Sequence, residues 1–514
     1  MSVFVVSRRL ILEKYQYDKL NKMMDACNRF YNHGVKHMIE CMSALKKDHW
    51  YKACLNRYME CKNKLNDTSL TKKETKHLES ELKMFSEELS LCREAYGVTK
   101  YELHAFLGRI KTNSLNKMLG INIIQKIGDN LWEAVSDVLF KKGKLLHYRK
   151  YGKTMSFEDK RANSGIIPDK KDESLVKICG MQVRIKAIRK SDWYLQAALR
   201  NKLKYCRIKR ECHGLKYKHF LEYILDGEIP VKHQIGDGVT GIDPGVSTMS
   251  YYNDKKADFI VLGDGIEKYE AEIKKWSRIY ERRMRVNNPE NYNSDGTIKT
   301  DSENFHKRWK HTKGMRYAVM KLKSAYQKKR SFLKVSHGTQ TNIILHLTQS
   351  LIIESMDYKA LAKRASDANK KSKASLPESQ KPKRKSRFGR SILRRAPSAF
   401  ITRLETKILN QGGSVSSVNM KTYKASQYNH ITRQPVKKSL NERTFLIDNQ
   451  LVQRDLYSSF LLRFKKDMDT INFDLCDKNF ENFINLQKNV VDKIKIIGDT
   501  TRNFGIRNFL NNNN

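Results

Sequence analysis

The sequence lacks the features of secreted, membrane-spanning and zinc-binding proteins. Its nine cysteines are odd in number and include no C-x-x-C pair, which argues against a disulfide framework and against a cysteine zinc site. It contains no signal peptide and no apolar run of bilayer-spanning length. Gly152-Lys153-Thr154 lacks the upstream glycine of a phosphate-binding loop. These absences predict a cytoplasmic protein with reduced thiols, no zinc and no membrane association.

Acidic residues are scarce relative to basic ones. The chain has 100 Lys and Arg against 55 Asp and Glu, a formal net charge of +45. Because unneutralised charge of this size destabilises a compact chain, a long polyanion is the expected partner. A ribosome-associated or membrane-surface protein is the alternative, although basic residues spread along the whole chain disfavour the membrane. The 39% hydrophobic residues can form real cores, and 514 residues allow about three domains.

The pattern of the N-terminal half predicts a strand, then a helical insertion, then further strands. A strand is predicted at 3–12, followed by helical spacing to about residue 119. Residues 177–207 alternate between apolar and basic side chains, and a further strand is expected from Trp193. Arg184 and Lys186 are nucleic-acid-binding candidates, because basic residues on one face of a sheet can follow a phosphate backbone. The wet face of an antiparallel barrel explains the same pattern.

Three acidic residues in the C-terminal half lie at the ends of predicted elements. Asp243 ends an apolar run that a meander of two further strands follows, Glu354 ends a buried run, and Asp455 lies in the first turn of an amphipathic helix. Each alone is more typical of a turn or helix cap. Together they could converge on two divalent cations that activate water for phosphodiester cleavage. Such oxygen ligands favour Mg²⁺ or Mn²⁺.

Basic segments accompany these acids. Helical stretches at 266–280 and 305–333 carry many Lys and Arg and could line a nucleic-acid channel. Residues 370–395 are densely basic, which is typical of a loop ordered on nucleic acid or of a localisation patch. The nucleic-acid-binding candidates of this half are Lys383, Arg384, Arg387, Arg390 and Arg454.

Three segments resemble the RuvC motifs of the TnpB (OrfB) proteins of insertion sequences, which are similar to type V CRISPR-Cas effectors. They are Gly241-Ile242-Asp243-Pro244-Gly245, Ile352-Ile353-Glu354-Ser355-Met356 and Gln453-Arg454-Asp455-Leu456-Tyr457-Ser458-Ser459-Phe460. Phe388-Gly389-Arg390-Ser391 through Ala396-Pro397, and Lys424-Ala425-Ser426-Gln427, are similar to the segment leading to the family's zinc ribbon. The resemblance is specific over roughly 237–465 and only architectural before it.

The resemblance implies a multidomain α/β protein, α+β overall. The implied domains are a wedge-like β-barrel split between 1–12 and 113–236, a helical recognition insertion at 13–112, an RNase H-like RuvC nuclease domain at 237–414 and 454–514, and a degenerate zinc-ribbon-like hairpin at 415–453.

The implied activity is RNA-guided, Mg²⁺-dependent cleavage of DNA. Asp243, Glu354 and Asp455 would be both the catalytic residues and the metal ligands. The implied partners are a non-coding guide RNA and a target DNA, in a prokaryotic cytoplasm at the nucleoid, with a monomer or a dimer as the active species.

The sequence departs from the family pattern at the zinc ribbon. Two cysteine pairs are replaced by Tyr428-Asn429-His430-Ile431 and Leu446-Ile447-Asp448-Asn449. Since a lone His430 cannot form a tetrahedral zinc site, a packed hairpin is expected there. Ser355-Met356 also replaces an acidic-leucine pair in the middle motif.

Two other functions fit parts of the pattern. An RNA-guided DNA-binding regulator without cleavage would be favoured by the loss of an acid, and all three acids are present. A guide-independent transposition or recombination nuclease, such as a junction resolvase, would be expected from a far shorter chain without the basic N-terminal half.

Overall fold

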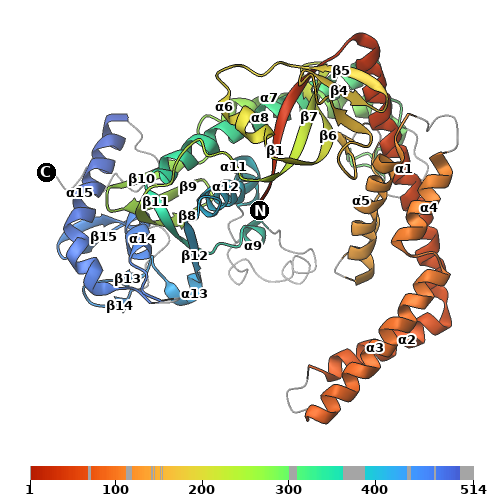
Figure 1. Ribbon diagram of the computed structural model, residues 1–514. Helices are drawn as coiled ribbons and strands as arrows, with labels where there is room; N and C mark the ends of the chain where they lie inside the picture. Colours follow the sequence, from red (N-terminus) through yellow and green to blue (C-terminus); the bar gives the residue numbers. More distant parts are fainter. Residues whose placement is uncertain are drawn as a thin grey trace. The chain divides into compact units, whose positions relative to one another are not determined.

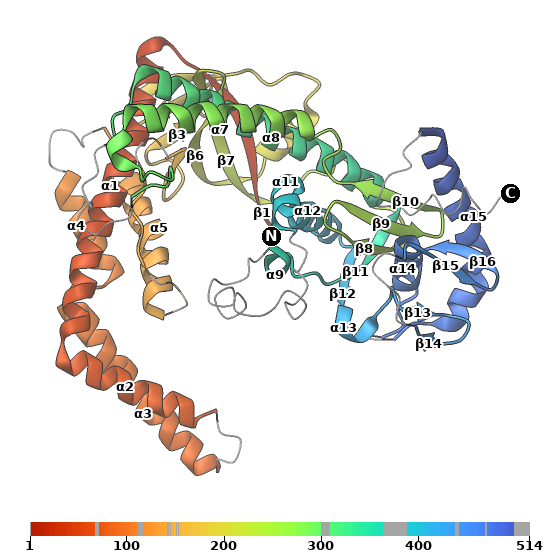
Figure 2. The same ribbon diagram turned by 180° about the vertical axis from the view of Figure 1, so that it is seen from behind.

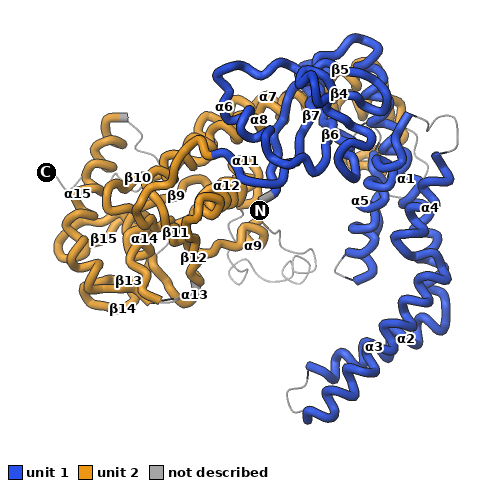
Figure 3. Tube along the Cα trace, in the orientation of Figure 1, with its two compact units in different colours: residues 1–230 blue, residues 231–514 orange. Residues whose placement is uncertain are grey.

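The protein is a mixed α/β chain of two compact units. The computed structural model describes residues 2–66, 71–111, 118–140, 143, 145–150, 152, 154–299, 309–362, 388–436, 442–467 and 470–497. Unit 1 is Met1–Pro230 and unit 2 is Val231–Asn514 (Figure 3). Among the described residues, no helix combines the length and the apolar character needed to cross a bilayer.

An antiparallel seven-stranded sheet forms the β part of unit 1, in the order β2-β6-β7-β1-β5-β4-β3. Its strands are β1 (Ser2–Ile11), β2 (Ser156–Glu158), β3 (Ile166–Pro168), β4 (Leu175–Ile178), β5 (Met181–Ile185), β6 (Lys202–His213) and β7 (Lys216–Gly227). β3 is the last strand at one end of the sheet, and it contacts β6, the second strand from the other end. The sheet is therefore strongly curled and nearly closed. The predicted alternation is confirmed in β5, where Met181, Val183 and Ile185 are buried and Arg184 is exposed.

Five helices are inserted between β1 and β2. They are α1 (Lys14–Lys47), α2 (His49–Lys64), α3 (Lys72–Ala95), α4 (Lys100–Lys111) and α5 (Ile121–Phe140). In α5 the residues Ile124, Ile127 and Leu131 are buried at helical spacing, so helix continues beyond the residues predicted as the helical insertion, whose bounds as a domain stay a prediction. The nine cysteines are all unpaired.

The strand predicted from Trp193 is wrong. Residues Trp193–Leu199 form a short helix, α6, whose first turn is capped by Asp192 accepting a hydrogen bond from the Leu195 backbone N–H at 3.3 Å. An aspartate in this position satisfies an otherwise unpaired donor and favours the helix over an extended strand. The strand begins instead at Lys202.

A five-stranded sheet organises unit 2, in the order β10-β9-β8-β11-β12. Its strands are β8 (Gly238–Pro244), β9 (Thr248–Asn253), β10 (Lys256–Val261), β11 (Thr348–Glu354) and β12 (Ser414–Val418). The predicted meander is confirmed, because β8, β9 and β10 pair in antiparallel fashion. β11 runs parallel to both β8 and β12. The carboxyl ends of β8 and β11 therefore meet at one edge of the sheet.

Helices cover both faces of this sheet (Figures 1 and 2). The helices of unit 2 are α7 (Glu267–Asn287), a 3-10 turn η2 (Pro289–Asn291), α8 (Lys313–Leu345), α9 (Tyr358–Ala362), α11 (Gly389–Arg395), α12 (Pro397–Leu409), α13 (Met420–Tyr423), α14 (Arg454–Arg463) and α15 (Phe473–Ile497). One core joins the sheet to α12 and the end of α8, and another joins it to α14 and α15. The basic helix predicted to end at Leu333 continues to Leu345.

Two short hairpins lie within residues 415–453, where the sequence predicts a packed hairpin. β13 (Tyr428–Asn429) pairs with β14 (Gln434–Pro435), and β15 (Thr444–Ile447) pairs with β16 (Gln450–Gln453). β16 leads directly into α14, so this hairpin fixes where the helix of the third acid begins.

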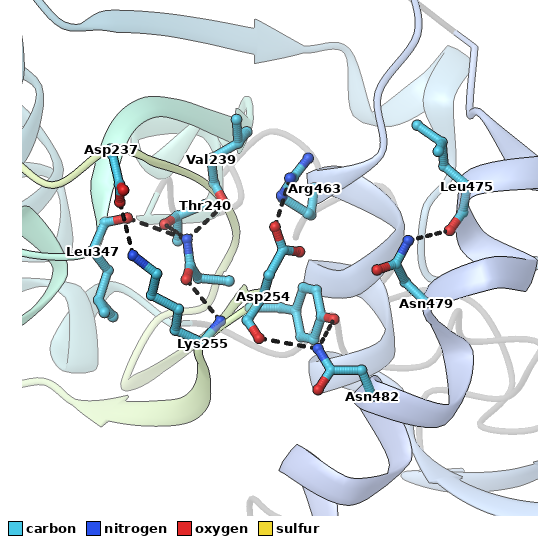
Figure 4. A network of polar contacts seen from close by, with 12 residues as sticks. Asp237, Val239, Thr240, Asp254, Lys255, Leu347, Arg463, Leu475, Asn479 and Asn482 are labelled. Carbon is cyan, nitrogen blue, oxygen red and sulfur yellow. Dashed lines mark hydrogen bonds and ion pairs between the residues drawn. The ribbon is translucent and has the colours of Figure 1, made fainter.

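Polar contacts fix α14 and α15 to the turn between β9 and β10 (Figure 4). Asp254 pairs with Arg463 at the end of α14 at 2.8 Å, and the Asn482 side chain of α15 donates to the Asp254 carbonyl at 3.0 Å. Because α14 begins at Arg454 and ends at this pair, its position along the sheet is set at both ends.

Replacing Gly241 with alanine should destabilise unit 2. An added Cβ would meet the backbone of Ser459 and of Arg463, neither of which can rotate away. Overpacking of this kind costs roughly 1–3 kcal/mol. Hydrogen exchange of the α14 amides and the thermal unfolding temperature would report the loss.

The matched control is Gly108→Ala in α4. Nothing lies within 4 Å of its added Cβ, so this variant should be stabilised by about 0.5–1 kcal/mol, as expected for alanine over glycine in a helix. Equal behaviour of the two variants would contradict the close approach of α14 to β8.

Candidate active site

Asp243 and Glu354 end two neighbouring parallel strands. Ile242 of β8 pairs with Ile353 of β11, so Asp243 and Glu354, the next residue of each strand, lie beside each other. Both isoleucines point into the core shared with α12, and side chains alternate along a strand. Asp243 and Glu354 therefore lie side by side on the opposite face, toward α14.

Ser250 positions the third acid next to this pair. It is the cross-strand partner of Asp243 on β9. Its hydroxyl donates to the backbone carbonyl of Asp455 at 2.5 Å and lies 2.5 Å from the hydroxyl of Ser459. One side chain thus anchors the first turn of α14 to the strand pair that carries Asp243, and the predicted place of Asp455 in that turn is confirmed.

The three acids influence one another electrostatically. Removal from water raises the pKa of Asp243 well above its usual value, and the charges of Asp455 and Glu354 raise it further. Ser458 and Arg454 act in the opposite direction on the same pKa. Glu354 is only 7% exposed, and its burial raises its pKa from the usual 4.5 to about 7. Such strongly shifted carboxyl groups are characteristic of functional sites.

Two arginines hold the carboxylate of Asp455. Arg443 Nη1 lies 3.1 Å from Oδ2, and Arg454 Nε and Nη2 each lie 3.2 Å from Oδ1. Arg454 is half-buried and also donates to the carbonyl of Glu442 at 3.1 Å. We call Arg443 and Arg454 the arginine pair. It neutralises the third acid, whereas no cationic side chain forms a described ion pair with Asp243 or Glu354.

The β15–β16 hairpin brings the arginine pair together. Arg443 directly precedes β15, Arg454 directly follows β16, and the Arg454 N–H donates to the Arg443 carbonyl at 2.9 Å. The turn residues Asp448 and Asn449 have φ of 48° and 57°, as a tight two-residue hairpin turn requires. Sequence reasoning selected Arg454 but missed Arg443. Asp448-Asn449 between two apolar runs was the sequence signal for a hairpin turn, and such a hairpin would place Arg443 opposite Arg454.

The donor set suits a hard divalent cation, although the acids are not arranged as a finished site. Three carboxylates offer the oxygen ligands that Mg²⁺ and Mn²⁺ prefer, and a cation would relieve the repulsion that raises the pKa of Asp243. As the described residues stand, no three His, Cys, Asp or Glu side chains could hold a metal ion. The carboxylate of Asp455 is in contact with both arginines of the pair.

His430 lies inside a packed aromatic cluster. It is buried, its Nδ1 lies 2.6 Å from the hydroxyl of Tyr457, and its ring centroid lies 4.6 Å from that of Phe480. Burial lowers the pKa of His430. His430 therefore joins the β13–β14 hairpin to α14 and α15.

The predicted nucleic-acid-binding residues are divided between the two units. Arg184 and Lys186 are exposed in unit 1, and Arg390 is exposed on α11 in unit 2. Arg454 is engaged with Asp455. Lys383, Arg384 and Arg387 lie outside the described residues.

Comparisons with known proteins give only distant likenesses. No family model and no curated protein matches the chain. A cryo-EM structure of a Cas12f1-sgRNA-target DNA complex is similar over 88% of this chain and 83% of that chain, with a TM-score of 0.41 and 11% identity. A CRISPR-Cas12f ternary complex covers 89% and 86%, with a TM-score of 0.25 and 11% identity. A Cas12i1 R-loop complex before target DNA cleavage covers 94% and 66%, with a TM-score of 0.26 and 8% identity. Likenesses this weak assign no activity.

Replacing Glu354 with glutamine should stabilise unit 2 at pH 8 without divalent cations. Burial raises the pKa of Glu354 from 4.5 to about 7 in the folded state, so the folded protein holds this proton more tightly than the unfolded chain does. The free energy of unfolding therefore falls as the pH rises from 4.5 to 7. At about 1.4 kcal/mol per pKa unit, the gain should reach up to about 3 kcal/mol at pH 8 and shrink toward pH 5. Thermal unfolding at both pH values measures it.

The control is Glu481→Gln on the exposed face of α15, which changes the same chemical group away from the acids. Relative to the wild type, only Glu354→Gln should become more stable as the pH rises. A pH-independent difference between Glu354→Gln and the wild type would contradict the burial of an ionisable group at this position.

Proposed function

We propose that this protein is an RNA-guided DNA endonuclease with a RuvC-type site, of the TnpB or type V effector kind. The observation that supports the proposal is the electrostatic coupling of three acids: the charges of Asp455 and Glu354 both raise the pKa of Asp243. Asp243 and Glu354 end two neighbouring parallel strands, and Asp455 lies in the first turn of α14. A five-stranded sheet with three antiparallel strands followed by two parallel ones supports an RNase H-like reading of unit 2. The distant solved structures are not needed for it.

Asp243, Glu354 and Asp455 would hold the divalent cations. When bound, Mg²⁺ or Mn²⁺ would activate water and neutralise the leaving oxygen of a phosphodiester. Asp243 and Glu354 are fixed by the sheet, whereas Asp455 must exchange its arginine partners for a cation. Because the pKa of Glu354 lies at about 7, this carboxyl group releases a proton when it becomes a ligand, and cation binding should strengthen as the pH rises.

The arginine pair has two consequences for this chemistry. It keeps Asp455 neutralised while no cation is bound, which limits repulsion among the three acids. Once released, Arg443 and Arg454 would place positive charge at the start of α14, where a phosphodiester backbone would have to approach the acids.

The net charge of +45 supports a nucleic acid as the partner. In this proposal a guide RNA pairs with the target DNA, and the protein holds the duplex by its backbone. Unit 1 would serve as a wedge-like barrel with a helical recognition insertion, the hairpins at 415–453 would contact the target, and the protein would act at a prokaryotic nucleoid. Arg184, Lys186 and Arg390 are exposed and suited to phosphate contacts.

A regulator that binds target DNA without cutting is the second candidate. The occupied carboxylate of Asp455 favours it, because a permanently held ligand would prevent cation binding. The two candidates share the RNA and DNA partners and differ only in cleavage, so a cleavage assay separates them.

Purified protein with its co-purifying RNA and Mg²⁺ should cut DNA complementary to that RNA. Asp243→Asn should lower the cleavage rate by about a thousandfold or more, since the substitution removes a charged ligand worth several kcal/mol in the transition state. Binding of the same DNA, measured by gel shift, should persist. Sequencing the bound RNA supplies the target sequence for the assay.

Asp474→Asn is the matched control, because Asp474 is an exposed residue of α15 and is paired with Arg433. It should cut at the wild-type rate. Unchanged cleavage by Asp243→Asn would refute the assignment of the acids. Tight target binding by the wild type without cleavage in either Mg²⁺ or Mn²⁺ would establish the regulator instead.

A further inference from the structure

Two helices of unit 2 meet along a line of basic side chains outside the proposed nuclease site. α12 packs against the last part of α8, and both contribute to the core on one face of the five-stranded sheet. Residues four positions apart lie in one row along a helix. We call the line formed by Lys334, Gly338 and Asn342 of α8 with Arg403 and Lys407 of α12 the α8–α12 seam.

Uncharged oxygens fix both cations of α12 in the seam. Arg403 Nη1 donates to the backbone carbonyl of Lys334 at 2.9 Å, and the ammonium group of Lys407 donates to Oδ1 of Asn342 at 2.5 Å. Gly338 leaves room for the guanidinium group, because an added Cβ there would lie 3.3 Å from Arg403 Nη1. Both cations are partly buried and held in place, so they keep their positions without a counter-charge.

No carboxylate within the described chain compensates these two cations. α8 contains neither Asp nor Glu. Glu405 is the one acid of α12, and it lies two positions from both Arg403 and Lys407, on another side of the helix. Burial lowers the pKa of Arg403 and of Lys407, and the charge of Arg403 lowers that of Lys407 further. Partial removal of a cation from water costs stability unless an anion meets it.

Two other partly buried cations show the contrast. Lys329 of α8 lies 2.5 Å from Glu270 of α7, and Arg207 of β6 lies 2.6 Å from Glu158. Burial disfavours the charge of Arg207 as it does that of Arg403, but the carboxylate partners of Arg207 outweigh this effect and raise its pKa. The seam lacks the negative charge that these two cations have, and this predicts an anionic ligand.

Two histidines extend the row of donors beyond the end of α8. His346 follows the last residue of α8, and its ring packs edge-on against that of His233, with centroids 5.5 Å apart. The Gln411 side chain, one turn beyond Lys407, donates to the His233 carbonyl at 3.1 Å. Imidazole N–H groups donate to phosphate oxygens whether the ring is neutral or charged.

The length of this row selects the kind of anion. From Gly338 to His346 the chain advances by about 12 Å, at about 1.5 Å per helical residue. A single inorganic anion would contact only part of such a row. One strand of a nucleic-acid duplex presents a phosphate about every 3.4 Å along the axis, so consecutive phosphates can meet successive donors.

We propose that the α8–α12 seam binds consecutive phosphates of one nucleic-acid strand, with Arg403 and Lys407 as the central ligands. The strand is the guide RNA or the target DNA, since the same chemistry recognises both. The inference rests on the proposed function for its partner and uses neither the three acids nor cleavage.

The test compares three double variants of the full-length protein. Arg403→Gln with Lys407→Gln removes both cations and is the neutral seam variant. Arg403→Lys with Lys407→Arg keeps both charges while changing the same side chains, and is the charge-keeping variant. Lys478→Gln with Lys488→Gln removes two charges from exposed positions of α15 outside the seam and is the matched control.

Binding is measured by fluorescence anisotropy in EDTA, which prevents metal-dependent cleavage, at several salt concentrations. One arm uses the RNA that co-purifies with the protein, removed and added back. The other arm uses the protein with that RNA and a DNA complementary to it.

In at least one arm, the neutral seam variant should bind about tenfold more weakly than the matched control, as expected for lost hydrogen bonds to charged groups. Its plot of log affinity against log salt should be shallower by about 1.4 to 1.8, because two phosphate contacts no longer release counterions. The charge-keeping variant should keep the slope of the matched control. The arm that responds identifies the strand.

Thermal unfolding shows whether the variants are folded. If the neutral seam variant unfolds earlier than the matched control, Lys407→Gln alone decides the question, because its ammonium group donates to a side-chain amide that water can replace. Its slope should then be shallower by about 0.7 to 0.9.

Three results would overturn this inference and leave the proposed function standing. They are a salt slope equal to that of the matched control in both arms, an equal loss of slope in the charge-keeping variant, and displacement of the strand by polyglutamate as readily as by unlabelled RNA. Failure of the wild type to bind either nucleic acid would overturn the inference and the proposed function together.

Discussion

The repulsion among buried carboxylates is the constraint around which unit 2 is organised. The parallel pairing of β8 and β11 forces Asp243 and Glu354 to end side by side, on a face that α14 covers. Burial alone raises the pKa of both groups, and the charge of the third acid adds to the effect on Asp243. A protein without a use for these groups would gain stability by replacing them. In the proposed nuclease, this stability cost is the consequence of placing the metal-binding carboxylates at the strand ends.

The arginine pair and Ser250 show how the fold tolerates this cost. Ser250 holds the backbone of Asp455 beside Asp243, while Arg443 and Arg454 draw its carboxylate toward the β15–β16 hairpin. The backbone of Asp455 is thus fixed beside Asp243, and in the proposed nuclease only its side chain would have to move. The β15–β16 hairpin turns at Asp448 and Asn449, whose positive φ angles give a tight two-residue turn.

The sequence predicted the parts of this site that depend on local pattern. Asp243 and Glu354 were recognisable because apolar runs end at them, and Asp455 because an amphipathic helix begins beside it. The contact of Asp455 with Arg443 was not predictable in the same way, since it depends on the register of a hairpin whose strands have only four residues each. Trp193–Leu199 was misassigned as a strand because its aromatic residues outweighed the Asp192 cap.

A crystal of the protein with guide RNA and target DNA, grown in Mn²⁺, tests whether the three acids form one metal site. Anomalous scattering from Mn²⁺ should give a peak bounded by the carboxylates of Asp243, Glu354 and Asp455, with Asp455 separated from Arg443. A structure with nucleic acid bound, Asp455 still paired with Arg443, and no manganese between the acids would contradict the proposed nuclease site.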